Sequence, residues 1–401
     1  MVVITINDTT EFHLREKKAE MDKEYTVSHL QRKPTVFLGG ETYGHYIMRQ
    51  FKEQGMLAAK PRVLEIGPGL GDLAESAIGY LGKHHDLDSY TMLDLAPAFV
   101  DHLRSRFNSD RRVRVLQGDA LQLQQAVGDG YDLLICNEIM GDLPTVFVHS
   151  GFKFRDDAEN ATLCNVTGGK LHSQDSSGDA QPNNPDEQLY ADILRMFRTY
   201  YLWDVFEPQI AGGGVPFNWG AYRLLEQMPA VLAKGATVWI AETSHRRDDV
   251  DYHPEHWCVE EISLPGHNEY EVDFDYLKII ANGCGIRTQS TGPLYKFLKL
   301  PTDVGFIDPP GIGVIRATIE EILHNLGDSE VSPEVRRKWS SPMETLAYRP
   351  SELFDLFKQF MKEAQIESGD AEMFVALKLK GSMKKATRIA VGLDYFLGTN
   401  D

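Results

Sequence analysis

Three glycines stand between a predicted strand and a predicted helix in VLEIGPGLGDLAE, residues 63–75. They are Gly67, Gly69 and Gly71. Glycine suits this turn because a β-carbon would keep the backbone from folding closely beneath a ligand. A dinucleotide-binding GxGxxG loop would have glycine where this chain has Asp72, and a carboxylate there disfavours a pyrophosphate. No GKS or GKT follows, which excludes a P-loop, while Glu65 just before the glycines favours a cationic ligand with an amino group.

Two further acids follow the next two predicted strands. Asp94, in LDLAP, is placed to accept hydrogen bonds from both hydroxyls of a ribose. Asp119, in QGDAL, is placed to accept one from an adenine amino group, with Leu95 against the adenine face. Each acid alone has a plainer interpretation as a helix cap. Together with Glu65 they indicate a pocket for a cationic adenosine compound, because each acid stands at the end of a successive strand.

The segments that must position these side chains alternate between short apolar runs and amphipathic stretches. PRVLEIG, SYTMLDL, RVRVLQG and YDLLICN predict strands, and 72–82 and 97–107 predict helices. The sheet is expected to resume at 235–245, and 373–381 predicts an antiparallel closing strand. This alternation is typical of a parallel sheet with helices on both faces, in which ligands bind beyond the carboxyl ends of the strands.

The arrangement resembles the class I S-adenosylmethionine methyltransferases, whose first motif ends in GxGxG and whose second strand ends in an acid. CNEIMGDLPT, at the end of the fourth strand, is similar to the NEFFDALPV motif of the MidA-like family, which includes the mitochondrial complex I assembly arginine methyltransferase. EIGPGLGDL, VDFDYL and GPLYKFL also resemble segments of that family, and the likeness runs with gaps from about 61 to 300. The resemblance implies an α/β, Rossmann-like class I methyltransferase fold with a mostly parallel seven-stranded sheet, and S-adenosylmethionine as cofactor.

By matching position, the resemblance assigns residues of this chain to parts of the cofactor site. The methionine end falls to Glu65, Gly67, Gly69 and Gly71, the ribose and adenine to Asp94, Leu95, Asp119 and Ala120, and the reaction centre to Asn137 and Glu138, with Asn137 also contacting the cofactor. The acceptor side departs from the family. Its FFDAL becomes IMGDL, with Asp142 displaced by one position, and its DYGH becomes ETSH.

These departures favour a small-molecule acceptor, methylated at oxygen, nitrogen or carbon, over the protein arginine that the family resemblance suggests. An arginine needs carboxylates that orient its guanidinium, a role open to Glu138, Asp142 and Glu242 if they converge. A non-catalytic assembly or interaction factor that binds S-adenosylmethionine is the alternative from another class. A nicotinamide oxidoreductase is disfavoured by Asp72 and the missing GxGxxG.

The stretch 242–267 is rich in groups that activate an oxygen or carbon acceptor, by general base or by metal. His245 follows a predicted strand directly, which makes it the candidate catalytic base or ligand, with a structural histidine as the equal alternative. Pro254 and the lack of a fixed ligand spacing favour a polar surface loop over a metal site. The candidate metal ligands are Glu242, His245, His253 and His256, and His267 ends the stretch.

Composition limits the other classes of function. The 401 residues are 42% hydrophobic and carry a formal net charge of −18, which disfavours nucleic-acid binding. The sequence lacks an apolar run of the roughly 18 residues that a membrane span needs, and it lacks a secretory signal. Four scattered cysteines favour a reducing cytoplasm. The expected parts are an N-terminal helical cap (1–60), the cofactor-binding half (61–150), a substrate-side insertion (151–230), and the remaining core with C-terminal helices and the closing strand (231–401).

Overall fold

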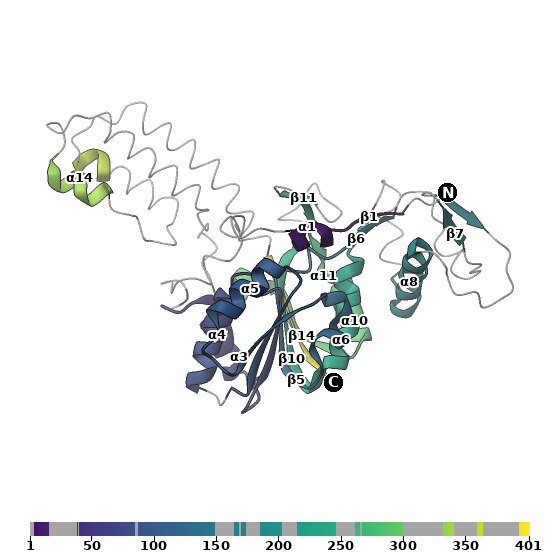
Figure 1. Ribbon diagram of the computed structural model, residues 1–401, viewed down its shortest axis with the longest axis horizontal. Coiled ribbons are helices and arrows are strands. Elements are labelled where there is room, and N and C mark those ends of the chain that lie inside the picture. Colours follow the sequence, from purple (N-terminus) through teal and green to yellow (C-terminus); the bar gives the residue numbers. More distant parts are fainter. Residues whose placement is uncertain are drawn as a thin grey trace.

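A large sheet flanked by helices forms the centre of the computed structural model (Figure 1). The structure describes residues 4–15, 38, 40–84, 87–148, 164–167, 170–173, 185–202, 215–245, 261–264, 267–299, 332–340, 359–363 and 393–401. Among these residues, none of the helices has both the length and the apolar character needed to cross a membrane.

Seven strands follow one another across the sheet in the order β14, β15, β10, β5, β2, β3, β4, and the short β13 pairs with β10 as an eighth. The five strands from β10 to β4 are parallel, and β15 runs antiparallel to both of its neighbours. This confirms the expected mostly parallel sheet. The strands are β2 (Arg62–Ile66), β3 (Ser89–Asp94), β4 (Val113–Gln117), β5 (Tyr131–Asn137), β10 (Leu232–His245), β13 (Val272–Asp273), β14 (Ile286–Pro293) and β15 (Leu393–Asn400).

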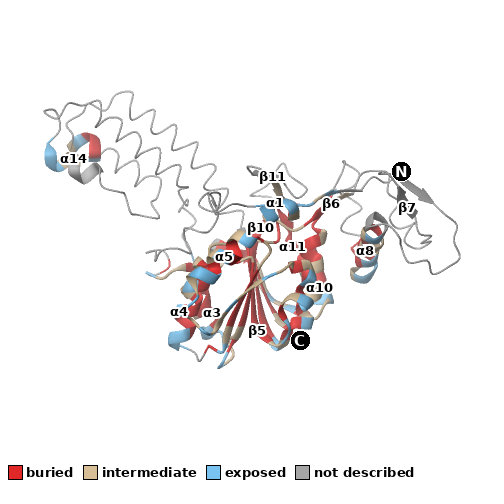
Figure 2. Cartoon of the chain, in the orientation of Figure 1, coloured by how far each residue is buried: buried red, intermediate tan, exposed pale blue. Residues whose placement is uncertain are grey.

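Both faces of the central strands are buried (Figure 2). Successive side chains of a strand point to opposite faces, so each strand contributes to the core on both sides of the sheet. In β5, Leu134 and Cys136 join the core cluster with α6 (Leu123–Val127), α8 (Pro185–Tyr200), α10 (Trp219–Val231) and α11 (Phe274–Gly283). Leu133 and Ile135 join the opposite cluster, with α3 (Tyr43–Glu53), α4 (Asp72–His84) and one residue of α5 (Pro97–Arg106). Shorter helices are η3 (Ala120–Gln122), α12 (Leu294–Phe297) and α14 (Pro333–Ser340).

The N-terminal segment, expected to be helical, also supplies a strand. β1 (Ile4–Asn7) pairs antiparallel with β6 (Thr145–Val148), which in turn pairs with β9 (Val215–Phe217). The short helix α1 (Thr10–Arg15) follows β1 and lies at one end of the main sheet (Figure 1). Two small hairpins are formed by β7 (Cys164–Thr167) with β8 (Lys170–Ser173), and by β11 (Glu261–Leu264) with β12 (His267–Tyr270).

The antiparallel strand of the sheet is β15, close to the C-terminus. The segment 373–381, expected to fill that role, lies outside the described residues. Both segments contain a short run of consecutive apolar residues, MFVAL in 373–381 and YFL in β15, so the local pattern alone did not single out β15 as the closing strand.

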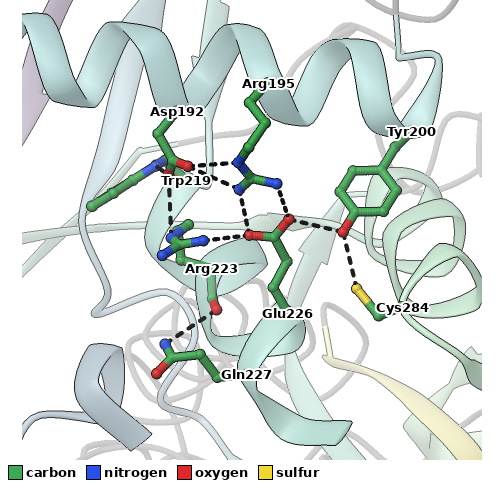
Figure 3. A network of polar contacts seen from close by, with 8 residues as sticks. All are labelled: Asp192, Arg195, Tyr200, Trp219, Arg223, Glu226, Gln227 and Cys284. Carbon is green, nitrogen blue, oxygen red and sulfur yellow. Dashed lines mark hydrogen bonds and ion pairs between the residues drawn. The ribbon is translucent and has the colours of Figure 1, made fainter. Parts of the chain in front are cut away.

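A polar network joins α8 to α10 (Figure 3). Glu226 of α10 accepts two hydrogen bonds from Arg195 of α8, each 2.6 Å, and a third of 2.6 Å from Arg223. The hydroxyl of Tyr200 donates to the same carboxylate at 2.8 Å. Burial opposes ionisation, but Arg195 and the other donors hold the pKa of Glu226 below its usual range. The carboxylate therefore compensates two guanidinium groups at the junction of the two helices.

Replacing Glu226 with glutamine is expected to lower the free energy of unfolding by about 1–3 kcal/mol, because each guanidinium group then loses one of its two carboxylate partners and keeps Asp192. Thermal unfolding measures the change. Glu11→Gln is the control. Glu11 forms an exposed ion pair with Arg15 four residues later in the same helix, and the expected change on losing it is within about 0.5 kcal/mol. Equal changes in the two variants would show that the network adds no net stability.

Candidate active site

The carboxyl ends of β2, β3, β4 and β5 meet at one edge of the sheet, because these four parallel strands are neighbours. Two backbone hydrogen bonds join the loops that leave them. The Gly67 N–H donates to the Leu93 carbonyl and the Gly118 N–H to the Asp94 carbonyl, each at 2.9 Å. This edge therefore carries the acids and the amide predicted from the sequence. They are Glu65, Asp94, Asp119 and Asn137, all within two residues of a strand end.

The glycine loop needs its glycines. The backbone φ angles of Gly67, Gly69 and Gly71 are 65°, 53° and 82°, in the left-handed region that β-carbons disfavour. A β-carbon on Gly67 would also overlap the side chain of Ile139, in the loop after β5. The loop is therefore tight against its neighbour at the point where the sequence predicts a ligand.

Glu65 is a buried carboxyl at the next-to-last position of β2, just before the glycine loop, with 2% of its surface exposed. The hydroxyl of Tyr90 donates to its Oε2 at 2.6 Å. Burial raises the pKa of Glu65 to about 7, with the Asp94 charge acting in the same direction and the Tyr90 hydrogen bond opposing. A buried carboxylate of this kind gains most from a cationic partner, because it otherwise ionises at a cost.

Asp94 and Asp119 both have the turn-capping contact that was the plainer interpretation. One Asp94 oxygen accepts from the Ala96 N–H, and one Asp119 oxygen accepts from the Leu121 N–H, each at 2.8 Å. Each cap uses Oδ1 and fixes the direction of the carboxylate at the edge of the sheet. Capping and ligand binding are thus compatible roles. Of the apolar neighbours predicted to line the adenine, Leu95 is half-buried and Ala120 is buried.

Asn137 ends β5 and lies beside two further polar groups. Its Oδ1 accepts a 2.8 Å hydrogen bond from the hydroxyl of Tyr43, at the start of α3, and its Nδ2 donates to Glu138 at 3.2 Å. Burial raises the pKa of Tyr43, so its hydroxyl stays protonated and donates. Glu138 has a φ of 53°, unusual for a residue with a side chain, and its N–H donates to the Ala241 carbonyl at 2.7 Å. Such strain is concentrated at functional sites.

Glu242 of β10 fastens the loop after β5. Its Oε2 accepts from the N–H groups of Met140 (2.7 Å) and Gly141 (3.2 Å), and its Oε1 accepts from the Thr243 N–H at 2.8 Å. Burial and the nearby Glu269 raise its pKa to about 8, while the backbone donors oppose the shift. Glu242 therefore positions the loop that follows the predicted reaction-centre residues Asn137 and Glu138.

The three carboxylates that were considered for orienting a guanidinium each contact a different group of the protein. Glu138 accepts from Asn137, Glu242 accepts from backbone N–H groups, and Asp142 faces His13 at 3.3 Å. Each of the three carboxylates therefore already has a partner within the protein.

Of the four candidate metal ligands, Glu242 is the one whose side chain is described. His245 ends β10, where its backbone pairs with β13, but its side chain lies outside the described residues. His253 and His256 lie wholly outside them. The roles assigned to these histidines stay predictions. His267, at the end of the same stretch, lies instead beside Asp142 and His13, in a cluster that spacing along the sequence did not indicate.

The model of the ribosomal RNA adenine dimethylase family matches residues 46–148. The ribosomal RNA small subunit methyltransferase A of Methanococcoides burtonii is 33% identical over 92 residues, which cover 23% of this chain and 29% of that protein. The chain thus spans less than a third of this curated relative. The matched segment runs from α3 to β6 and contains the four strand ends described above.

Solved structures similar to this chain include two proteins from Burkholderia thailandensis. One, uncharacterised, has a TM-score of 0.48 at 14% identity and covers 98% of this chain and 86% of its own. The other, bound to S-adenosyl-homocysteine, has a TM-score of 0.44 at 12% identity, covering 90% and 77%. The order and directions of the seven strands, with the matched segment, identify the expected class I methyltransferase fold.

Proposed function

We propose that this chain is a methyltransferase that uses S-adenosylmethionine and methylates a small molecule. The observation that carries the proposal is the position of Glu65, Asp94 and Asp119, one acid at the end of each of three adjacent parallel strands around a glycine loop. The match to the adenine dimethylase family covers the same elements and supports it.

The described residues fit the parts of this cofactor. Glu65 offers a buried negative charge to the ammonium of the methionine end, and Asp94 offers a carboxylate to the ribose hydroxyls. Asp119 and Ala120, at the start of η3, are proposed to contact the adenine. When bound, the cofactor would supply a methyl group on a sulfonium, and an acceptor lone pair would take that methyl group by in-line displacement of the sulfide, S-adenosyl-homocysteine. The protein's part is alignment and a suitable electrostatic environment.

At the reaction centre, Asn137 is held by Tyr43 and in turn donates to Glu138. This chain of hydrogen bonds fixes the amide and the carboxylate relative to the end of β5. A fixed amide and carboxylate suit an acceptor that presents hydroxyl or amino groups, which they orient toward the methyl group. A protein arginine, the MidA-like alternative, is less favoured because each of the three carboxylates considered for its guanidinium already has a partner within the protein.

An RNA adenine is the second candidate acceptor, favoured by the family model and by the Methanococcoides burtonii relative. The net charge of −18 opposes it, because a phosphate backbone is repelled unless basic groups gather locally. The match is also limited to the proposed cofactor-binding elements, and methyltransferases that act on unrelated acceptors share those elements. We therefore place the small molecule first. We further propose a cytoplasmic location, with which the free thiols of Cys136 and Cys284 agree.

Calorimetric titration of the full chain with S-adenosylmethionine and S-adenosyl-homocysteine tests the proposal. We expect binding of one molecule per chain, with affinity for both ligands. Incubation with labelled S-adenosylmethionine and separate pools of metabolites, arginine-containing peptides and ribosomal RNA then identifies the acceptor. Binding without transfer to any pool would favour the non-catalytic assembly factor, and an absence of binding would overturn the cofactor assignment.

A further inference from the structure

Four side chains from three distant segments meet beside the loop that follows β5. The Nε2 atom of His13 lies 3.3 Å from Oδ1 of Asp142, and Nε2 of His267 lies 3.5 Å from the same oxygen. Oε1 of Glu269 lies 3.0 Å from His267 Nε2. The candidate ligand atoms of the two histidines and Asp142 all lie within 4.8 Å of one another. Two imidazoles and the Asp142 carboxylate therefore face a common point, and the Glu269 carboxylate lies beside His267.

Contacts other than those among the four polar groups bring these segments together. Pairing of β1 with β6 lays the N-terminal segment beside the loop after β5. The Thr9 hydroxyl then donates to the Asp142 carbonyl at 2.5 Å, and the Tyr270 N–H donates to the Gly141 carbonyl at 3.4 Å. The ring of Phe12 stacks on His267, with 4.2 Å between centroids. The cluster is thus built by backbone pairing and ring packing, as a preorganised site requires.

The chemistry of the donor set points to a transition metal. Ligand atoms bound to one ion at about 2.0–2.2 Å are separated by roughly 3–3.5 Å, and the contacts of Asp142 with His13 and His267 have these lengths. Both are contacts to a single oxygen, Oδ1, which lacks a geometrically satisfactory hydrogen bond. Imidazole nitrogen with carboxylate oxygen suits Zn²⁺ and its neighbours, whereas Mg²⁺ and Ca²⁺ prefer oxygen alone.

We propose that His13, Asp142 and His267 bind one divalent transition-metal ion of the Zn²⁺ class, with Glu269, beside His267, as the fourth ligand. The side chains are 12–23% exposed, which leaves the site open to entry from solvent. The ion joins α1 and β12 to the loop that begins at Asn137 and Glu138, and it neutralises the two carboxylates. It therefore fixes the N-terminal segment over the acceptor side of the site.

The competing explanation is a protonated histidine held between the two acids. Burial opposes the charged form, but Asp142 and Glu269 raise the pKa of His267 to about 9. An imidazolium there needs no metal. The two explanations differ in what chelation does, because removing an ion changes the metal content and the thermal stability, whereas a proton network is indifferent to a chelator at constant pH.

The test uses the full chain, stripped with a chelator and dialysed, then titrated with ZnCl₂ by calorimetry and with CoCl₂ by visible absorption. We expect one equivalent of Zn²⁺, a Co²⁺ absorption band, and a Tm that rises by several degrees on addition of Zn²⁺. His13→Ala and Asp142→Asn are each expected to weaken Zn²⁺ binding at least about 100-fold, as loss of one of four ligands does.

His84→Ala, on the exposed end of α4, is the matched control and is expected to bind Zn²⁺ as the parent does. A folded parent that binds no stoichiometric Zn²⁺, or a His13→Ala variant that binds it undiminished, would overturn the proposal. An unchanged Tm after chelation, with a Tm that falls in Asp142→Asn, would assign the cluster to the proton network instead. None of these readouts depends on methyl transfer, which separates this proposal from the proposed function.

Discussion

Replacing Asp94 with alanine is expected to weaken binding of S-adenosylmethionine about 100-fold, which is about 2.7 kcal/mol. The carboxylate ends β3 at the ligand edge of the sheet, where it accepts both ribose hydroxyls in the proposed complex. Hydrogen bonds to a charged group contribute about 1.5–3 kcal/mol each, and part of the gain from two of them is offset by desolvating the carboxylate. Calorimetric titration of parent and variant measures the loss.

The turn that Asp94 caps has to be separated from ligand binding. Its Oδ1 accepts from the Ala96 N–H at 2.8 Å, and loss of such a cap costs about 1 kcal/mol of stability. Asp94→Asn retains an oxygen for the cap but loses the charge, so we expect parent-like thermal unfolding with an affinity between those of parent and Asp94→Ala. Asp101→Ala removes an exposed acid of α5 as the control. Parent-like affinity in Asp94→Ala would remove this residue from the ribose site.

The meeting of the three acids at one edge of the sheet was predictable because that geometry follows from local order. Apolar runs and amphipathic stretches alternate between 61 and 136, and a parallel sheet built from them brings its carboxyl strand ends to one edge. Glu65, Asp94 and Asp119 then need no long-range information to lie near one another. The positive φ angles of the three loop glycines have the same local origin.

The acceptor side was not predictable in this way, because it depends on contacts between distant segments. Tyr43 reaches Asn137 from α3, and His13 reaches Asp142 through the pairing of β1 with β6. The two residues of each contact are far apart in the sequence, so no local spacing of residue types predicts either contact. The search for metal ligands within 242–267 followed local spacing, while the structure places His267 with a histidine near the N-terminus.

Binding of S-adenosylmethionine is expected to weaken as the pH falls below 7, by up to tenfold per pH unit between about pH 7 and 5.5. Burial raises the pKa of Glu65 to about 7 in the unliganded protein, and a cationic ligand selects its ionised form. Below this pH a proton must leave before the cation binds, so the acid limb of the affinity profile reports Glu65. Calorimetry at several pH values, in buffers of different ionisation enthalpy, measures both the limb and the proton released.

Glu65→Gln should abolish that acid limb and lower the affinity at pH 7.5 by about 30-fold, or about 2 kcal/mol. The same substitution is expected to have the opposite effect on stability. A carboxyl whose folded pKa lies above the unfolded value near 4.5 loses stability as the pH rises through about 7, so the glutamine variant should gain about 1–3 kcal/mol over the parent above that pH. Glu75→Gln, in the first turn of α4 and exposed, should keep the limb. A Glu65→Gln variant that is more stable than the parent yet binds the cofactor weakly would show that the buried charge of Glu65 serves ligand binding. An unchanged acid limb of the affinity profile in this variant would assign the titration to another group.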